Sequence, residues 1–225
     1  MPVPEPVVRG RSLGVDYATA AGTAAALVDV DLDLEAGRLS VIAGPSGSGK
    51  SSLLRVLAGL ARATTGSVSV AGTDLTRLRT GALRRLRRRT MGVVLQNPAD
   101  NLLDYLTALE QLELAARLRG APADGAGALL DAVGLGERAG NRPAELSGGE
   151  QQRVAFAAAA IGTPALLLAD EPTAQLDAAA GAALVATMRR LIEAGATLVV
   201  TSHDDAVIDA ADHVVRLRDG KVVLA

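Results

Sequence analysis

Apolar and polar residues alternate with a period of two in two segments near the start of the chain, RSLGVDYA (11–18) and ALVDVDLDLEAG (26–37). In an extended chain this period places the apolar side chains on one face and the polar ones on the other. The pattern is typical of half-buried antiparallel strands. We therefore predict an antiparallel β subdomain at the start of the chain.

Wholly apolar segments follow, and each ends on polar residues. The predicted strands are RLSVIAG (38–44), MGVVLQ (91–96), ALLLADEP (165–172) and ATLVVTSHDD (196–205). Helical spacing in KSSLLRVLAGL (50–60) and AGAALVATMRRLIEAG (180–195) predicts helices between them. Apolar strands that alternate with helices indicate an α/β fold with a mostly parallel sheet covered on both faces.

The segment from Asn101 to Ala160 has a different pattern. NLLDYLTALEQLELAARLRG (101–120) and GALLDAVGL (127–135) show helical periodicity on either side of a break rich in Gly, Pro and Ala. This periodicity predicts an inserted α-helical subdomain. The predicted organisation is one domain over residues 1–225, with a core formed by 1–96 and 161–225 and a helical subdomain over 97–160.

A glycine-rich loop, GPSGSGKS (44–51), lies between a predicted strand and a predicted helix, which is the context that the Walker A pattern requires. Its glycines let consecutive backbone amides turn toward a β-phosphate, Lys50 neutralises the β and γ charges, and the Ser51 hydroxyl ligates Mg²⁺. We therefore predict a P-loop NTPase core that binds ATP and Mg²⁺. The residues expected to bind the nucleotide here are Gly44, Ser46, Gly47, Ser48, Gly49, Lys50, Ser51 and Ser52.

Two acidic residues end the apolar strand LLLADE (166–171). Asp170 is expected to hold the magnesium, directly or through water, and Glu171 to orient and partly deprotonate the attacking water. A lone pair of this kind is more often a helix cap or a surface charge. The Walker A loop in the same chain favours the catalytic interpretation.

Two further side chains follow predicted strands. Gln96 ends MGVVLQ, and its neutral amide is expected to bind either the magnesium or the attacking water. His203 follows LVVTS, where an imidazole reaches the γ-phosphate and holds Glu171 or the water in place. A histidine is also a common structural hydrogen-bond donor, and we assign that role to His213.

Two adjacent glycines in ELSGGEQQR (145–153) follow Ser147, a residue type that caps helices. The free amides at a helix start attract negative charge. This segment is therefore a second cradle for phosphate. One subunit can hardly fold both cradles around a single triphosphate.

Composition restricts the partners and the location. A net charge of -2 and the near absence of aromatic residues disfavour a nucleic-acid surface. One exception is a cluster of arginines, which forms either a solvated helix face or a contact for phosphates or anionic lipid heads. The cluster consists of Arg84, Arg85, Arg87, Arg88 and Arg89.

Neither a membrane span nor a secretory signal is expected. No segment approaches the roughly 20 apolar residues that cross a bilayer, and MPVPEPVVRGRS at the start lacks the secretory pattern. The chain contains no cysteine, which agrees with a reducing compartment. We therefore expect a cytoplasmic location.

The motifs together resemble the full set of an ABC-type ATPase, the nucleotide-binding subunit of an ABC transporter, over essentially the whole chain. The resemblance implies a head-to-tail dimer in which the serine and glycines of one copy complete the γ-phosphate site on the Walker A loop of the other. It also implies a membrane-spanning permease as partner and attachment to the inner face of the cell membrane. The motifs are GPSGSGKSS, Gln96, LSGGEQQR, LLLADE, AQLD (174–177) and His203.

The resemblance adds further nucleotide-binding residues. Ser147, Gly148, Gly149 and Gln151 belong to the signature segment, and Asp177 is implied to link the two sites across the interface. Tyr17 aligns with the aromatic that stacks on adenine, and a half-buried strand residue is the alternative.

Finer features of YLTALEQLELA (105–115) and LADEPTAQLD (168–177) are similar to the ATPases of lipoprotein-releasing, macrolide-export and cell-division-associated ABC systems. Two other functions fit the same motifs. One is a soluble ABC ATPase that acts on nucleic acid or ribosomes, and the other is a subunit that signals through a membrane protein to a cell-wall enzyme.

Overall fold

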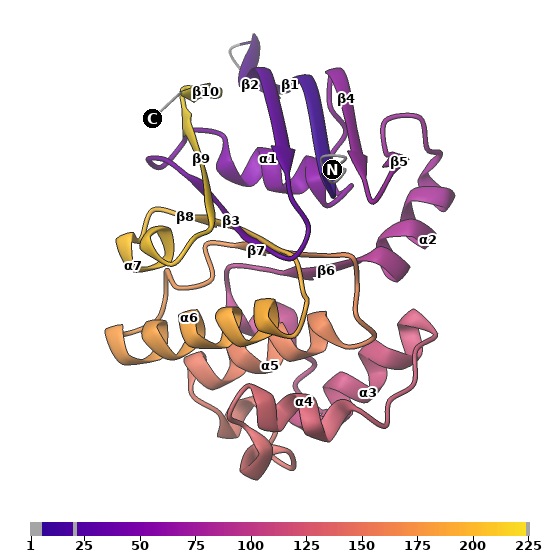
Figure 1. Cartoon of the computed structure of the whole chain (residues 1–225), viewed down its shortest axis with the longest axis vertical. Helices are drawn as coiled ribbons and strands as arrows, with labels where there is room; N and C mark the ends of the chain where they lie inside the picture. The colour runs from indigo at the N-terminus through magenta and orange to yellow at the C-terminus, as the bar shows by residue number, and fades with distance from the viewer. Residues whose placement is uncertain (1–5, 20–21, 224–225) are drawn as a thin grey trace, which may run out of the picture.

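Two β-sheets enclose one helix, and a layer of helices covers the outer face of the larger sheet (Figure 1). The computed structural model describes residues 6–19 and 22–223. The first five residues, which carry part of the expectation that there is no secretory signal, lie outside the described residues. None of the helices in the described ranges is long and apolar enough to cross a membrane.

The smaller sheet is antiparallel and has the strand order β2-β1-β4-β5. Leu27, Val30 and Leu32 are buried on its inner face while the acidic residues between them are exposed. The alternation in the sequence therefore predicted this sheet correctly. Its strands are β1 (Val8–Thr19), β2 (Gly22–Leu34), β4 (Thr65–Val70) and β5 (Thr73–Asp74).

The larger sheet has the order β10-β9-β3-β8-β7-β6 and is parallel except for β10. Its central strands are buried at every position and are mostly apolar, because helices or the smaller sheet cover both of their faces. Together the sheets confirm the predicted α/β fold class. The strands are β3 (Leu39–Ala43), β6 (Met91–Val94), β7 (Leu166–Asp170), β8 (Leu198–Ser202), β9 (His213–Arg218) and β10 (Lys221–Val223).

Two hydrophobic cores lie on the two faces of the larger sheet. One contains α1 (Lys50–Leu57), which packs between the sheets, and the other contains the helices drawn below the larger sheet in Figure 1. The remaining helices are α2 (Thr80–Thr90), α3 (Ala108–Arg119), α4 (Ala126–Ala132), α5 (Gly148–Ala160), α6 (Ala178–Glu193) and α7 (Asp205–Asp209). Short 3-10 helices lie at Pro98–Asn101, Gly136–Arg138 and Pro143–Glu145.

The helix predicted from Asn101 onward was wrong at its start, because α3 begins only at Ala108. The side chain of Gln111 holds the preceding segment out of the helix: Nε2 donates to the Leu103 carbonyl at 2.6 Å, and Oε1 accepts from the Leu103 amide at 3.2 Å. Thr107 then caps α3. Apolar spacing alone does not reveal such side-chain hydrogen bonds to the backbone.

Four neighbouring parallel strands, β3, β8, β7 and β6, end at the same edge of the larger sheet. The chain leaves these strands at Gly44, His203, Glu171 and Leu95 respectively. The polar residues that follow the strands are therefore collected at this edge, where ligands of parallel sheets usually bind.

Candidate functional site

The Walker A loop turns tightly between β3 and α1, and its glycines are required by their surroundings. Gly44, Gly47 and Gly49 have φ of 157°, 80° and 100°. A Cβ on Gly44 would collide with the Leu217 carbonyl, and one on Gly49 with the Ala26 carbonyl. Glycine is the residue that permits this path without a steric penalty.

Lys50 lies in this loop as a buried cation that is 6% exposed. Its Nζ donates to the carbonyls of Gly44 and Pro45, at 2.9 and 3.1 Å, and lies 3.1 Å from Glu171 Oε1. The neighbouring Ser48 hydroxyl is buried and has no hydrogen-bond partner within the described chain. A buried ammonium and an unpartnered hydroxyl beside a glycine cradle fit an anionic phosphate.

Asp170 lies at the end of β7 beside the start of α1. Its Oδ1 accepts from the Ser51 hydroxyl at 2.9 Å and from the Thr201 hydroxyl at 2.6 Å. Mg²⁺ prefers such oxygen ligands and usually binds one or two carboxylates together with substrate phosphates. No group of three or more His, Cys, Asp or Glu side chains that would hold a metal occurs among the described residues. The oxygens of Asp170 and Ser51 are the kind of ligand that fits a magnesium ion bound together with the phosphates of a nucleotide.

Glu171 has an unusual backbone, with φ of 43°. Its amide donates to both the carbonyl and the hydroxyl of Thr201, at 3.1 and 2.9 Å. A non-glycine residue in the left-handed region is strained, and it keeps this conformation only where its surroundings hold it there. Thr201 supplies this support, and sequence reasoning missed it. Its position in TSH, two residues before His203, was the available signal.

His203 is close to Glu171 on the side opposite Lys50. His203 Nδ1 lies 2.8 Å from Glu171 Oε2, and the imidazole is 66% exposed. The carboxylate of Glu171 is therefore held between a buried ammonium and an exposed ring. Both carboxylate oxygens of Glu171 are thus fixed by side chains from two other elements, which sets the position of this candidate general base.

Lys50, Glu171 and His203 share a cleft of about 490 Å³, whereas Asp170 is not among its lining residues. The structure brings Gln96 and Tyr17 to the same cleft, although Gln96 follows β6 and Tyr17 lies on β1 of the antiparallel sheet. The ring of Tyr17 is 41% exposed and leaves room for a stacked base. The lining residues are Tyr17, Ala26, Pro45, Ser46, Gly47, Gly49, Lys50, Ser51, Ser52, Gln96, Glu171 and His203.

The signature segment does not line this cleft within the described chain. Ser147 caps α5 through a capping box with Glu150, and Ser147 and Gly148 are exposed. Gly149 is buried, and a Cβ on it would lie 2.7 Å from Ala180 Cβ on α6. The two glycines therefore differ: Gly149 lets α5 approach α6, whereas Gly148 leaves the helix start open.

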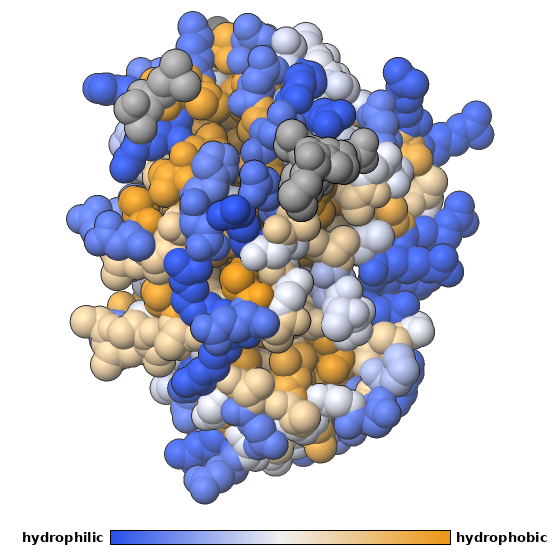
Figure 2. Space-filling model, viewed as in Figure 1, coloured by the Kyte–Doolittle hydropathy of each residue, from blue (hydrophilic) through white to orange (hydrophobic). Residues whose placement is uncertain are grey.

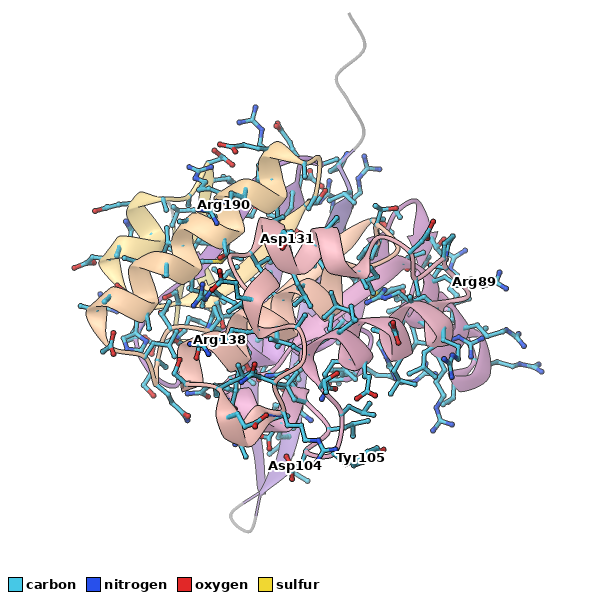
Figure 3. All side chains as sticks on the ribbon, turned by 90° about the horizontal axis from the view of Figure 1, so that it is seen from below. Arg89, Asp104, Tyr105, Asp131, Arg138 and Arg190 are labelled. Carbon is cyan, nitrogen blue, oxygen red and sulfur yellow. The ribbon has the colours of Figure 1, made fainter. Side chains whose placement is uncertain are left out.

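Glu150 stabilises this helix start. The hydrogen bond from the Ser147 amide, at 2.8 Å, is the main reason that the pKa of Glu150 lies below its ordinary value. Arg138, labelled in Figure 3, forms an ion pair with Glu150: the Arg138 Nε lies 3.4 Å from Glu150 Oε1.

The other two predicted ligands of this region have partners within the chain. The side-chain Nε2 of Gln151 donates to the carbonyls of Pro143 and Leu146, at 2.9 and 3.1 Å. These hydrogen bonds order the loop that precedes Ser147. Asp177 is exposed and caps α6 by accepting from the Ala180 amide at 2.8 Å.

Comparison with known proteins gives a consistent result. Residues 27–174 match the family described as ABC transporter. The lipoprotein-releasing system ATP-binding protein LolD of Anaeromyxobacter dehalogenans is 42% identical over 228 residues, which cover 99% of this chain and 95% of that protein. Macrolide export ATP-binding/permease protein MacB 1/2 of Paracoccus denitrificans is 41% identical over 222 residues, covering 97% of this chain. The chain spans only 33% of that MacB protein.

A solved structure has the same fold. The ATP-binding cassette MJ0796, in a dimeric post-hydrolysis state bound to ADP and Pi, aligns with a TM-score of 0.86 and 34% identity. The alignment covers 96% of this chain and 97% of that one. The combination of an antiparallel β subdomain and a mostly parallel sheet with helices is therefore shared with that cassette.

Proposed function

This chain belongs to the ABC transporter family and is an ABC-type ATPase, and we propose that it closes as a head-to-tail dimer around two Mg-ATP to drive a membrane-spanning permease. The observation that carries the proposal is the single cleft in which Lys50, Glu171 and His203 meet. The names of the LolD and MacB relatives favour export or extraction of a lipoprotein, peptide or drug-like substrate.

In this mechanism, the Walker A loop binds the triphosphate of ATP through its backbone amides and Lys50. Ser51, Asp170 and Gln96 would hold a magnesium ion, which would neutralise phosphate charge when bound. Tyr17 stacks on the adenine. The ion pair between Lys50 and Glu171 must open for Lys50 to reach a phosphate, which releases the carboxylate of Glu171 for its own role.

Glu171 then orients the attacking water and accepts its proton. His203 positions the Glu171 carboxylate and approaches the γ-phosphate, since its Nδ1 is already within hydrogen-bond distance of Oε2. Thr201 holds the backbone of Glu171 and the side chain of Asp170, and is therefore a positioning residue. The water oxygen attacks the γ-phosphorus in line with the bond to the β,γ-bridging oxygen, which breaks, so that ADP leaves and inorganic phosphate forms.

The second phosphate cradle serves the partner copy. Ser147 and Gly148 are exposed, lie at a helix start and do not line the cleft of their own described chain. In the dimer they would cap the γ-phosphate bound by the other copy, with Asp177 at the interface between the two sites. MJ0796 provides a dimeric precedent within the family.

The permease is proposed to contact the segment after Gln96. Leu95 immediately before Gln96, and Leu103 and Tyr105 after it, are exposed. Tyr105 is 68% exposed and lies at the edge of the molecule in Figure 3. An exposed apolar surface of this kind marks a protein contact. Closure of the dimer would tilt a short cytoplasmic helix docked on it, which places the chain at the cytoplasmic face of the membrane.

Replacing Glu171→Gln tests the proposal most simply. The variant should lose about 10² to 10⁴ of the hydrolysis rate, because the general base is removed, while ATP binding remains. Glu193→Gln is the matched control, since Glu193 is exposed at the end of α6 and the chemical change is the same. Hydrolysis by the Glu171 variant at the wild-type rate would contradict the assignment.

A further inference from the structure

The arginines of α2 form a concentrated positive charge on the described surface. Arg84, Arg85, Arg88 and Arg89 are exposed, α2 contains no acidic residue, and Figure 2 shows strongly hydrophilic side chains over this helix. Because the whole chain has a net charge of -2, the cluster does not follow from a generally basic composition.

The fold accounts for few of these charges. Arg87 donates to the Gly59 carbonyl at 3.1 Å. Arginines in the last turn also interact favourably with the negative end of the helix dipole. Arg84 and Arg85 lie too early in the helix for that effect. In the part of the chain that the structure describes, no arginine of α2 lies within 4.0 Å of a carboxylate. The exposed Arg9, Arg11 and Arg38, in contrast, all form ion pairs.

A cavity of about 500 Å³ lies beside this helix. Arginines of α2 line it together with apolar residues from the edge strand β6 and from α3, which we call its apolar floor. Leu118, on the rim, is 56% exposed. The lining residues are Arg84, Arg85, Arg87, Arg88, Met91, Val93, Ala115, Leu118 and Arg119.

Arg119 fixes the inner wall of the cavity. Its guanidinium donates to the carbonyls of Met91 and Ala159, at 2.8 and 2.9 Å, so it ties α3 to the edge strand and to α5. The apolar floor is therefore built into the packing of three elements. Side chains of α2 extend from it into solvent, and Arg89 points outward at the edge of the molecule in Figure 3.

We propose that this arginine pocket binds the headgroups of anionic phospholipids at the membrane surface. One guanidinium group can donate two hydrogen bonds to two oxygens of the same phosphate. The apolar floor would contact the glycerol and the first acyl carbons of the lipid. Arginines without partners suit a surface that presents many equivalent anionic groups, whereas a protein partner would need carboxylates in a fixed register. The contact would hold the ATPase against the membrane independently of nucleotide and permease.

Sedimentation of the full chain with vesicles tests this proposal. The wild type should bind vesicles of phosphatidylcholine mixed with phosphatidylglycerol and should not bind phosphatidylcholine alone. Binding should be lost at about 1 M salt, where the Debye length is about 3 Å. Millimolar inorganic phosphate should not displace the protein, which distinguishes a lipid surface from free phosphate.

The variant that removes the contact is Arg84→Gln, Arg85→Gln and Arg88→Gln combined. Arg87 and Arg119 are kept because they hydrogen-bond to the backbone, and glutamine keeps the helix propensity of arginine. Each substitution should lower the partition coefficient about fivefold, and the three together about a hundredfold. The control replaces Arg9, Arg11 and Arg38 by glutamine, which changes net charge equally but should preserve binding.

The opposite results would overturn the proposal. One such result is equal binding of the wild type to neutral and anionic vesicles. The other is an equal loss of vesicle binding in the two triple variants. If the pocket variant bound anionic vesicles normally but no longer associated with its permease, the arginines would belong to an acidic protein partner instead. Glu171→Gln should bind vesicles like the wild type, so a failure of this proposal is separable from a failure of the hydrolysis mechanism.

Discussion

Thr201→Val should both destabilise the protein and slow hydrolysis. The hydroxyl of Thr201 is fully buried, donates to Asp170 at 2.6 Å and accepts from the Glu171 amide at 2.9 Å. Valine fills nearly the same volume but makes neither hydrogen bond. The substitution thus isolates the hydroxyl from the packing of β8.

The structure sets the size of the effect. A hydrogen bond to a charged group contributes about 1.5–3 kcal/mol and a neutral one about 0.5–1.5 kcal/mol. Asp170 keeps its bond from Ser51, and the Glu171 amide keeps the Thr201 carbonyl. We therefore expect a loss of about 2–4 kcal/mol in the free energy of unfolding. Hydrolysis should fall as well, because the backbone of Glu171 loses a support in a strained conformation.

Urea denaturation followed by circular dichroism measures the stability, and phosphate release measures the rate. Thr201→Ser is the control: it keeps the hydroxyl and loses one methyl group, which costs about 1 kcal/mol. A valine variant as stable and as active as the serine variant would refute the role given to the hydroxyl.

Two further predictions concern the signature segment. Gly149→Ala should destabilise the protein by about 1–3 kcal/mol in urea denaturation, because the new Cβ would lie 2.7 Å from Ala180 Cβ. Gly148→Ala should leave the stability unchanged, because the nearest atom to its Cβ would be 3.9 Å away. Equal stability of the two variants would show that Gly149 is not needed for the approach of α5 to α6. The pKa of Glu150 is lower in the folded state than in the unfolded state, where it is about 4.3. The ionised carboxylate therefore stabilises the fold above the unfolded pKa. This contribution is lost as pH falls through the folded pKa. The melting temperatures of wild type and Glu150→Gln should therefore differ at pH 7 and converge under acid conditions, and a difference that does not change with pH would refute this linkage.

The layers of the fold could be predicted from the sequence because hydrophobic spacing reports burial directly. The alternation over 26–37 predicted β2, and the apolar segments 38–44 and 196–205 predicted β3 and β8. The start of α3 could not be predicted in this way. Residues 102–107 share the apolar spacing of the helix, but hydrogen bonds from Gln111 hold Leu103 in another conformation.

Motifs predicted the meeting of Lys50, Glu171 and His203 in one cleft, since each follows a parallel strand that ends at one edge of the larger sheet. They did not predict Thr201, because its role depends on the parallel pairing of β8 with β7, which brings it beside Asp170. The sequence also gave no basis for separating Gly148 from Gly149. That difference arises from α6, which approaches only one of the two glycines.

The head-to-tail arrangement can be tested by mixing two inactive variants, Lys50→Ala and Ser147→Ala. Each should hydrolyse ATP very slowly by itself. If Ser147 of one copy completes the site of the other, a mixed dimer contains one site with both residues intact. An equimolar mixture, with mixed dimers verified by two affinity tags, should regain about a quarter of the wild-type rate. Activity that stays at the level of the single variants would show that each chain uses its own Ser147, and would contradict the shared site.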